Sequence, residues 1–370
     1  MKFTCQKAIL SDAINITSRA VASKNAIPAL EGILIDCRKE GLILTSYNLE
    51  IGITTKCPAN VEEEGKTVVN ARLFSDIIHK LPDEDVVFES EGPGVTRIEC
   101  GPVEFSIPLI DPSEFPELPT IENEMSFTIN QDVLKNMINK TIFATAQTDI
   151  KPILTGLYFD IKGGVLNIVA IDNYRMALRR EKLLNFTADQ KDFDFVLPGN
   201  TARELEKILE DNEESLEVYL SSKKICFQLE NTTVISRLLE GKYYDYTTFI
   251  PKKGNITATI SKKRLSDAAE RVSLIINERL RNHIRFTLAG NAARLSCTST
   301  LGNASDEIIL DDSFDKFEIG FNSRIFLDAI KAVDTDELTM ELASPVLPCV
   351  ITPKDEDDYI QIIMPVRLKN

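Results

Sequence analysis

The histidines and cysteines of this chain are the side chains best suited to catalysis or metal binding, but their spacing favours neither. His79 and His283 are far apart, and no Cys or carboxylate stands at metal-ligand spacing from them. The seven cysteines are scattered and never form a Cys-x-x-Cys pattern. This usage is typical of small buried hydrophobes in a reducing, cytoplasmic compartment. We therefore predict no metal, no cofactor, and a structural or surface role for each histidine.

Motifs for phosphate binding and nucleophilic catalysis are also missing. Gly92-Pro-Gly94 is too short for a phosphate loop and lacks a following Lys-Ser/Thr, so a β-turn is expected there. No Gly-x-Ser-x-Gly segment occurs. In a chain with 57 Asp and Glu residues, chance pairs of carboxylates are the expected background. We assign no catalytic residue and predict that the protein is not an enzyme.

Six stretches share one helical spacing, in which apolar residues recur three and four positions apart along one face. We predict helices over 6–24, 70–81, 130–144, 199–209, 261–281 and 322–334. Polar residues that can accept a hydrogen bond from a first-turn N–H precede or open five of them: Asn70, Asn130, Thr201, Ser261 and Asn322.

Strand-like runs surround these helices in three similar sets, offset by roughly 125 residues, which indicates a triplicated unit. For example, 30–36 with 41–44 corresponds to 154–160 with 164–169 and to 283–288 with 293–297. We predict an α+β fold of three similar domains, each with two helices on one face of antiparallel sheets. Clusters of turn residues at 111–119 and 240–251 give the boundaries 1–119, 120–250 and 251–370.

The distribution of charge suggests the class of partner. The six predicted helices hold 17 Lys and Arg against 10 Asp and Glu, whereas the whole chain carries a net charge of −15. A basic helical surface inside an acidic shell favours a polyanion that touches one face only. Contacts of this kind are weak, sensitive to salt and blind to sequence. The alternative is that these Lys and Arg residues simply decorate solvated helix faces. No apolar run approaches the length that spans a membrane, so we expect no membrane partner.

Six short segments carry a family resemblance: Met1-Lys-Phe-Thr4, 27–32, 70–74, Asp172-Asn-Tyr-Arg-Met176, Gly320-Phe-Asn322 and Met364-Pro-Val-Arg-Leu368. In this order, on a threefold repeat, they resemble the bacterial DNA polymerase III β subunits, the sliding clamps. The resemblance covers essentially all 370 residues.

The resemblance implies a head-to-tail homodimeric ring in which twelve helices line a central hole and the sheets form the outer layer. Such a ring encircles duplex DNA without reading its sequence, slides along it, and tethers the replicative polymerase for processivity. The expected partners are double-stranded DNA, a second copy of the chain, the polymerase, the clamp loader, and other proteins that carry a clamp-binding peptide.

The resemblance also implies three sets of site residues. Those that match DNA-facing positions are Lys24, Arg72, Lys151, Arg203, Lys252 and Arg279. Those that match the dimer contact are Phe105, Ile107, Leu274 and Ile275. Those that match the peptide pocket between the second and third domains are Leu154, Ile171, Asn173, Tyr174, Arg175, Met176, Tyr244, Thr248, Phe249, Leu280, Asn322, Ile325, Val346, Pro348, Ile362, Ile363, Met364, Pro365, Val366, Arg367 and Leu368.

Several positions depart from the family pattern. Asn173 and Tyr174 stand where many relatives have glycine and histidine, Tyr244 replaces a proline, and Thr248 replaces an arginine. We expect a bulkier and less basic pocket, whose preferred peptide the sequence leaves open. Two rival functions also stay open: a repeat-built scaffold that binds proteins without encircling DNA, and an enzyme with an unfamiliar carboxylate site.

Overall fold

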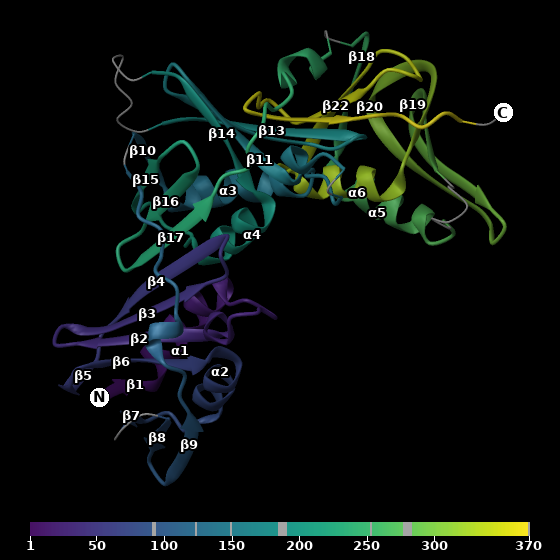
Figure 1. The fold of residues 1–370 in the computed structure, drawn as a ribbon. Helices are drawn as coiled ribbons and strands as arrows, with labels where there is room; N and C mark the ends of the chain where they lie inside the picture. The colour runs from purple at the N-terminus through teal and green to yellow at the C-terminus, as the bar shows by residue number, and fades with distance from the viewer. Residues whose placement is uncertain are drawn as a thin grey trace. The chain divides into compact units, whose positions relative to one another are not determined.

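The structure is a computed structural model that describes residues 1–90, 94–122, 124–148, 150–183, 191–251, 254–276 and 283–368. The chain divides into two compact units (Figure 1). Unit 1 comprises Met1–Leu134 with Arg203–Leu238, and unit 2 comprises Lys135–Ala202 with Leu239–Asn370. The predicted middle segment, 120–250, contributes to both units. The turn predicted at Gly92-Pro-Gly94 falls partly outside the described residues.

One order of elements occurs three times: a strand, a helix, further strands, a second helix and a final group of strands. The first set is β1 (Lys2–Gln6), α1 (Lys7–Thr17), β2 (Gly32–Arg38), β3 (Gly41–Tyr47), β4 (Ile51–Cys57), β5 (Asn60–Glu63), β6 (Gly65–Asn70), α2 (Ala71–Lys80), β7 (Asp85–Glu89), β8 (Val95–Cys100) and β9 (Val103–Pro108). The second set is β10 (Met125–Asn130), α3 (Gln131–Ile142), β11 (Gly156–Lys162), β12 (Val165–Ile171), β13 (Arg175–Lys182), β14 (Phe193–Pro198), α4 (Gly199–Ile208), β15 (Ser215–Leu220), β16 (Lys224–Gln228) and β17 (Thr232–Arg237). The third set is β18 (Ile256–Ser261), α5 (Lys262–Ser273), β19 (Ile284–Ser299), β20 (Gly302–Phe321), α6 (Ser323–Ala332), β21 (Glu337–Leu342), β22 (Cys349–Pro353) and β23 (Tyr359–Ile363).

The strand pairing repeats as well. In each set the first strand pairs antiparallel with the strand that follows the second helix, as β1 with β7, β10 with β15, and β18 with β21. The paired positions are apolar and buried on the core side, for example Phe3 opposite Phe88. Such cross-strand pairs fix the register, because a slip of one residue would turn the buried face to water. The predicted triplication and α+β class are confirmed.

Each unit contains two antiparallel sheets. In unit 1 the orders are β5-β1-β7-β8-β9 and β10-β15-β16-β17-β4-β3-β2-β6, and in unit 2 they are β14-β11-β12-β13-β23-β22-β21-β18 and β19-β20. Two ladders join strands from different sets: β4 pairs with β17, and β13 pairs with β23. The sheets therefore run on from one set of elements into the next.

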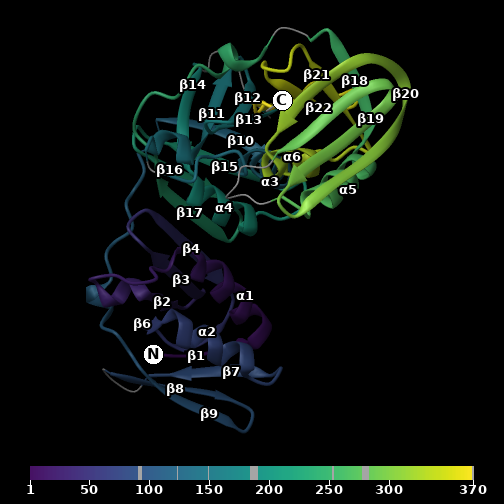
Figure 2. The ribbon, with the colours of Figure 1, turned by 90° about the vertical axis from the view of Figure 1, so that its right-hand side faces the viewer.

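The paired helices lie on one side of the sheets and bury their apolar stripes there (Figures 1 and 2). In unit 1, α1 contacts α2, and Leu10 and Phe74 are fully buried in a core that includes the stacked rings of Phe3 and Phe88. In unit 2, α5 contacts α6, and the ring of Phe326 stacks on that of Phe321 with centroids 4.7 Å apart. Each such buried side chain contributes about 1.5–3 kcal/mol to folding.

Two helices are shorter than the stretches that the apolar spacing predicted. The stretch 6–24 is helical to Thr17, continues as a 3₁₀ turn over Ser18–Ala20, and ends at Val21, whose backbone is extended. In the stretch 261–281, α5 ends at Ser273, and the described residues 274–276 are not helical. Both helices end where a hydroxyl bonds the carbonyl four residues earlier: Thr17 to Ala13 at 2.7 Å, and Ser273 to Ala269 at 2.6 Å. Such bonds compete with the continuing backbone ladder.

Some of the predicted helix caps are confirmed and others are not. Asn70 and Asn322 accept hydrogen bonds from the backbone N–H groups of Leu73 at 3.0 Å and Ile325 at 3.1 Å, so both are confirmed. Ser261 occupies the N-cap position of α5 without a capping bond from its side chain. The prediction for Thr201 is wrong, because it lies inside α4 and is buried.

Gly32 and Gly156 occupy equivalent places in the first two sets, at the start of β2 and β11. A Cβ atom would lie 2.8 Å from the carbonyl oxygen of Val69 at Gly32, and 2.5 Å from that of Leu197 at Gly156. Because no larger residue fits without a shift of backbone, the neighbouring strand can pass close to each glycine.

The remaining sequence predictions concern histidine, cysteine and membrane spans. His79 is exposed on α2, and its Nδ1 atom lies 2.7 Å from the carbonyl oxygen of Ser75. All seven cysteines are free and buried, as predicted. No described helix has both the length and the apolar character needed to cross a membrane.

Candidate nucleic-acid and peptide interfaces

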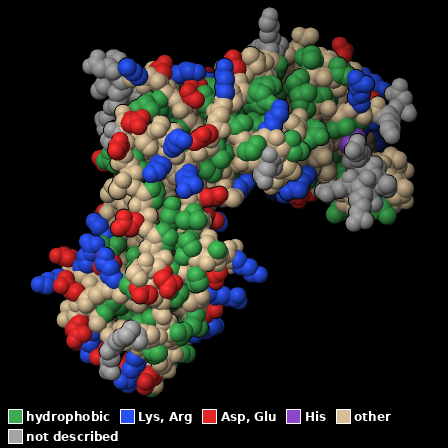
Figure 3. Space-filling view, in the orientation of Figure 1, with side chains coloured by type: hydrophobic (Ala, Val, Ile, Leu, Met, Phe, Trp, Pro, Cys, Tyr) green, Lys and Arg blue, Asp and Glu red, His purple; other side chains and the backbone are tan. Residues whose placement is uncertain are grey.

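The face of unit 1 that carries α1 and α2 presents cationic side chains to solvent. On α2, Phe74, Ile77 and Ile78 are buried, so Arg72 and Lys80 lie on the opposite, exposed side. Figure 3 shows Lys and Arg side chains projecting from the edge of unit 1 where α2 lies, whereas the opposite edge carries charges of both signs. This face can contact a polyanion through long, mobile cations.

Other helical cations are already engaged with carboxylates of the same chain. In unit 1, Arg19 and Lys207 both contact Glu204, at 3.1 and 2.8 Å. Burial alone would raise the pKa of Glu204, but hydrogen bonds from Lys207 and Arg19 hold that pKa below its usual value. In unit 2, Lys331 pairs with Glu270 at 2.7 Å. The positive charge available to a ligand is therefore smaller than the sum over the helices.

Lys140 departs furthest from the sequence prediction, which counted it among the surface cations. Its ammonium group is buried, donates to the carbonyl oxygen of Ala332 at 2.6 Å, and pairs with Asp334. The hydroxyl of Tyr359 donates to the backbone carbonyl of Lys140 at 2.9 Å. Lys140 thus fastens the end of α3 to the segment after α6 and is not available to a polyanion.

The predicted DNA-facing residues occupy different surroundings. In unit 1, Lys24 and Arg72 are exposed, Lys24 in the irregular segment beyond α1, and Arg203 is half-buried on α4. In unit 2, Lys151 is exposed, its Nζ atom contacts the Tyr244 hydroxyl, and it lies 4.9 Å from the centroid of that ring. Lys252 and Arg279 lie outside the described residues.

The residues predicted to form the peptide pocket separate into buried and exposed groups within unit 2. Leu154, Ile171, Met176 and Ile362 are buried in one apolar cluster, together with Tyr243. The Tyr243 hydroxyl accepts a hydrogen bond from the backbone N–H of Ile171 at 3.1 Å, which satisfies both groups. Ile363 is buried in the neighbouring core that α5 and α6 cover.

Large apolar side chains beside this cluster are exposed. Tyr174 is 61% exposed and Val346 is 64% exposed, and Tyr244, Phe249 and Met364 are also exposed. The sequence prediction missed Leu347, which is 50% exposed. The apolar pair Val346-Leu347 between Pro345 and Pro348 was the available signal, because a proline-bounded turn keeps such residues at the surface. The rings of Tyr244 and Phe249 are in contact, with centroids 6.2 Å apart, and exposed apolar contacts of this kind are typical of a docking site.

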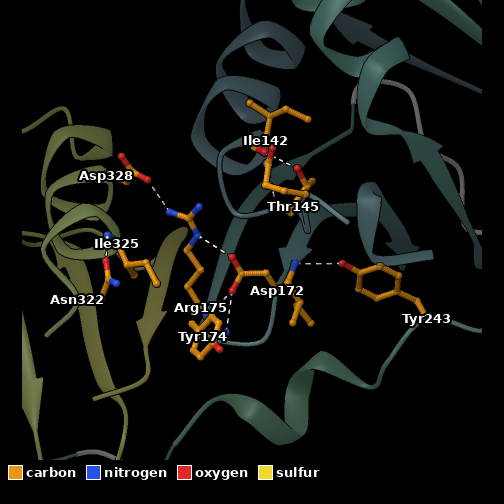
Figure 4. Close-up of polar contacts among 11 residues, drawn as sticks. Ile142, Thr145, Asp172, Tyr174, Arg175, Tyr243, Asn322, Ile325 and Asp328 are labelled. Carbon is orange, nitrogen blue, oxygen red and sulfur yellow. Dashed lines mark hydrogen bonds and ion pairs between the residues drawn. The ribbon is translucent and has the colours of Figure 1, made fainter. Parts of the chain in front are cut away.

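Arg175 links the turn before β13, which carries Asp172, to helix α6, which carries Asp328 (Figure 4). Its Nε atom lies 3.0 Å from Oδ2 of Asp172, and its Nη1 atom lies 2.7 Å from Oδ2 of Asp328 on α6. The Oδ1 atom of Asp172 accepts hydrogen bonds from the backbone N–H groups of Tyr174 and Arg175, at 2.7 and 2.9 Å. The turn that carries Tyr174 is therefore fixed by the same carboxylate that holds Arg175.

The other residues predicted for the pocket are exposed or half-buried where the structure describes them. The exposed ones are Asn173, Thr248, Asn322 and Arg367, and the half-buried ones are Ile325, Pro348, Pro365, Val366 and Leu368. The closing segment is held at two points, because Met364 N–H donates to the Tyr174 carbonyl and Val366 N–H to the Gly320 carbonyl, both at 2.8 Å. Leu280 lies outside the described residues.

The predicted dimer residues lie on both units. On unit 1, Phe105 is exposed on β9, which is an edge strand, and Ile107 is buried in the core. On unit 2, Leu274 is 81% exposed, and Ile275 packs partly buried against the core beneath α5. Phe105 and Leu274 are thus the members of this set that a second chain could reach.

Three repeats of paired helices on antiparallel sheets define a clamp-type fold, and comparisons with known proteins agree. The DNA polymerase III beta subunit family models match throughout: the N-terminal domain at residues 1–119, the central domain at 128–245 and the C-terminal domain at 247–367. A beta sliding clamp of Staphylococcus aureus is 33% identical over 99% of both chains.

Solved structures give the same result. The DNA polymerase sliding clamp of Bacillus subtilis superposes with a TM-score of 0.94 at 31% identity, and covers all of both chains. A sliding clamp of Pseudomonas aeruginosa bound to griselimycin gives 0.94 at 25% identity, also over both full chains. The chain belongs to the DNA polymerase III beta subunit family, which confirms the resemblance seen in the sequence.

Proposed function

We propose that this protein is a DNA sliding clamp, in which two copies close head to tail into a ring around duplex DNA. The observation that carries this proposal is the match of all three family models along the chain, with relatives named beta sliding clamps. The ring slides without reading sequence and tethers the replicative polymerase for processivity. The protein acts by topology and not by catalysis, and its proposed location is the cytoplasm.

The proposed ring is built from domains 1–119, 120–250 and 251–370 of each copy. Strand β9 ends the five-stranded sheet of unit 1, and β20 borders a sheet of only two strands in unit 2. Unpaired N–H and C=O groups along an edge strand favour pairing with another chain. Phe105, exposed on β9, and Leu274, exposed directly after α5, supply apolar contact. A first-domain to third-domain contact that occurs twice closes the ring.

DNA contact is assigned to Lys24, Arg72, Lys151, Arg203, Lys252 and Arg279. Such contacts to phosphates position the ring without gripping bases. The pairing of Arg19, Lys207 and Lys331 with carboxylates supports loose contact, because fewer cations remain for phosphates. A weakly held ring slides more easily than a tightly held one.

The exposed apolar residues of unit 2 are proposed as the docking site for a linear peptide shared by the polymerase, the clamp loader and other partners. Their support is the buried cluster that includes Leu154 and Met176, together with the exposed Tyr174 and Met364, which a backbone hydrogen bond joins at 2.8 Å. Val346 is exposed as well. Adaptable apolar residues suit a site that accepts several sequences. Tyr174, Tyr244 and Thr248 make this site bulkier and less basic than is usual in the family.

The solution mass and retention on DNA test this proposal. Light scattering at micromolar concentration should give a mass near twice 41.4 kDa. Protein loaded onto nicked circular DNA should stay bound through a high-salt wash and should leave when the circle is linearised. Linear DNA of the same length is the control. A monomeric mass, or retention that is unaffected by linearisation, would instead favour a scaffold that does not encircle DNA.

A further inference from the structure

A pair of cysteines in the first set of elements lies in direct contact. Cys5 is on β1 and Cys57 ends β4, and their Sγ atoms are 3.8 Å apart. They meet because the chain leaves the eight-stranded sheet at Cys57 and joins the edge of β1 three residues later, where Thr4 pairs with Asn60. Among the described cysteines, no other sulfur–sulfur contact occurs.

The environment of the two thiols is asymmetric. The Cys5 thiol lies 3.3 Å from the carbonyl oxygen of Pro58 and hydrogen-bonds with the Cys57 thiol. That hydrogen bond lowers the pKa of Cys5, and the same bond together with burial raises the pKa of Cys57. One sulfur is thus favoured as the attacking thiolate, and the other remains a protonated thiol.

Both thiols are buried, at 3% and 2% exposure, in the apolar core of unit 1. Their chain neighbours Gln6, Lys56 and Pro58 are exposed. These neighbours place the end of β4 at the surface, so a small oxidant reaches the sulfurs when that end opens locally. Forming a bond of about 2 Å requires the sulfurs to approach by less than about 2 Å, which rotation about the side-chain torsions can supply.

We propose that Cys5 and Cys57 are a redox-active pair that closes to a reversible disulfide when a peroxide oxidises the protein. The Cys5 thiolate attacks one peroxide oxygen, the O–O bond breaks, and hydroxide leaves a sulfenic acid on Cys5. The Cys57 sulfur then attacks the Cys5 sulfur, and the departing hydroxide takes the Cys57 proton as water. The two thiols lose two electrons in total, and hydrogen peroxide is reduced to two water molecules. A small dithiol reverses the reaction by exchange.

The disulfide would join the two sheets of unit 1, because β1 belongs to the five-stranded sheet and β4 to the eight-stranded sheet. It would close a long loop of chain, which restricts the unfolded state. Oxidised protein should therefore melt several degrees above reduced protein. The link would also fix the start of α1, which follows Cys5 by two residues.

The full-length protein, treated with dilute hydrogen peroxide and then quenched, tests the pair. The seven thiols, counted after denaturation, should fall to five, and the intact mass should fall by about 2 Da as two hydrogen atoms leave. Peptide mapping without reductant should recover a Cys5–Cys57 link, and dithiothreitol should restore seven thiols. Seven unchanged thiols, a link between other cysteines, or sulfinic acid at Cys5 without a link would each overturn the proposal.

Three variants isolate the pair. Cys5→Ser and Cys57→Ala should each lose the peroxide-dependent rise in Tm. Cys5→Ser should keep its six thiols, whereas Cys57→Ala should stop at a sulfenic acid on Cys5, with five thiols left and about 16 Da added. Cys226→Ser, at a buried cysteine without a cysteine neighbour, should still form the link. If one variant of the pair does not fold, the other variant and the peptide map of the unmodified chain decide the question. A rise in Tm that persists in Cys57→Ala contradicts the assignment.

Discussion

The guanidinium of Arg175 and the carboxylate of Asp328 bind strand β13 directly to helix α6, with Nη1 and Oδ2 2.7 Å apart. The same guanidinium pairs with Asp172 at 3.0 Å, and its central carbon lies 5.3 Å from the centroid of the Phe143 ring. Arg175 is only 11% exposed at its side chain, so these contacts hold it in one orientation. The exposed Tyr174 next to it is thereby kept at a fixed distance from α6.

Asp328→Asn should weaken this link while it keeps the shape of the side chain. Because the Asp328 carboxylate is partly exposed, we expect a loss of about 1 kcal/mol in unfolding free energy and a several-fold weaker binding of a clamp-binding peptide. Fluorescence anisotropy with a labelled polymerase peptide measures the binding, and urea unfolding measures the stability. Asp315→Asn on the exposed face of β20 is the matched control. Unchanged peptide affinity in Asp328→Asn would remove Asp328 from any role in positioning the site.

The sequence predicted a helix closely where its apolar stripe and its cap lie in the same short segment. The stretch 70–81 became α2 over Ala71–Lys80, because both its apolar stripe and its Asn70 cap are features of the sequence itself. The ends of α1 and α5 were predicted too late in the chain. Each helix ends at a residue whose hydroxyl bonds the carbonyl four residues earlier, and the apolar pattern does not encode such a bond. For α1, the buried Ser46 hydroxyl donates to the Thr17 carbonyl from a strand 29 residues away.

Residues of the candidate site could be predicted only where they belong to a short motif of the family. The segment Asp172-Asn-Tyr-Arg-Met176 pointed to Tyr174 and Arg175, but Asp328 is 153 residues from Arg175 and has no local pattern that indicates a partner. Lys140 was counted among the helical cations because it lies in the predicted helix 130–144, although its ammonium group contacts Ala332 and Asp334. Contacts of such large sequence separation come from the topology of the sheets and not from periodicity.

Lys140 and Asp334 should respond unequally to substitution. Lys140→Met fills the site with an apolar chain and leaves Asp334 in solvent, so we expect a loss of about 1–2 kcal/mol from the unpaired Ala332 carbonyl. Asp334→Ala leaves a buried ammonium short of its anion and should cost more, about 2–3 kcal/mol. Urea unfolding at neutral pH checks the order. Lys331→Met, which removes an exposed pair with Glu270, should cost less than about 0.5 kcal/mol.

Stability at acid pH should depend on Asp36. Its Oδ2 atom contacts Arg38 at 2.7 Å and Lys66 at 3.1 Å. Burial alone would raise the pKa of Asp36, but these cations outweigh burial and hold that pKa below its usual value. Because the folded pKa is depressed, the stabilisation is complete above the unfolded pKa of about 4 and is lost as pH falls through the folded pKa.

At pH 7, Asp36→Asn should therefore unfold at a lower urea concentration than the unmodified chain. The urea midpoints of the two proteins should converge as the pH falls towards 3. Asp83→Asn, at an exposed position, should follow the unmodified chain throughout. If the difference in urea midpoint between Asp36→Asn and the unmodified chain does not change with pH, the carboxylate charge is not what stabilises this site.

Leu274→Asp should prevent the proposed ring from closing. Leu274 is 81% exposed in the single chain, so a charge there has little effect on folding but would be buried without a partner in the dimer. Analytical ultracentrifugation should show a mass near 41.4 kDa, and retention on circular DNA should be lost. Ile150→Asp, at a still more exposed apolar residue outside the proposed contact, should remain dimeric. A dimeric Leu274→Asp protein would move the interface elsewhere.

Arg72→Gln should change how DNA binding responds to salt. Each phosphate contact contributes about 0.9 to the slope of log affinity against log salt concentration, because a counterion leaves the DNA. Two copies of Arg72 face the DNA in the proposed ring, so the slope should fall by about 1–2, equally for DNA of any sequence. Titration of labelled duplexes over a range of salt measures it. Lys39→Gln, in the exposed turn between β2 and β3, should leave the slope unchanged. Equal slopes for Arg72→Gln and the unmodified protein would place α2 away from DNA.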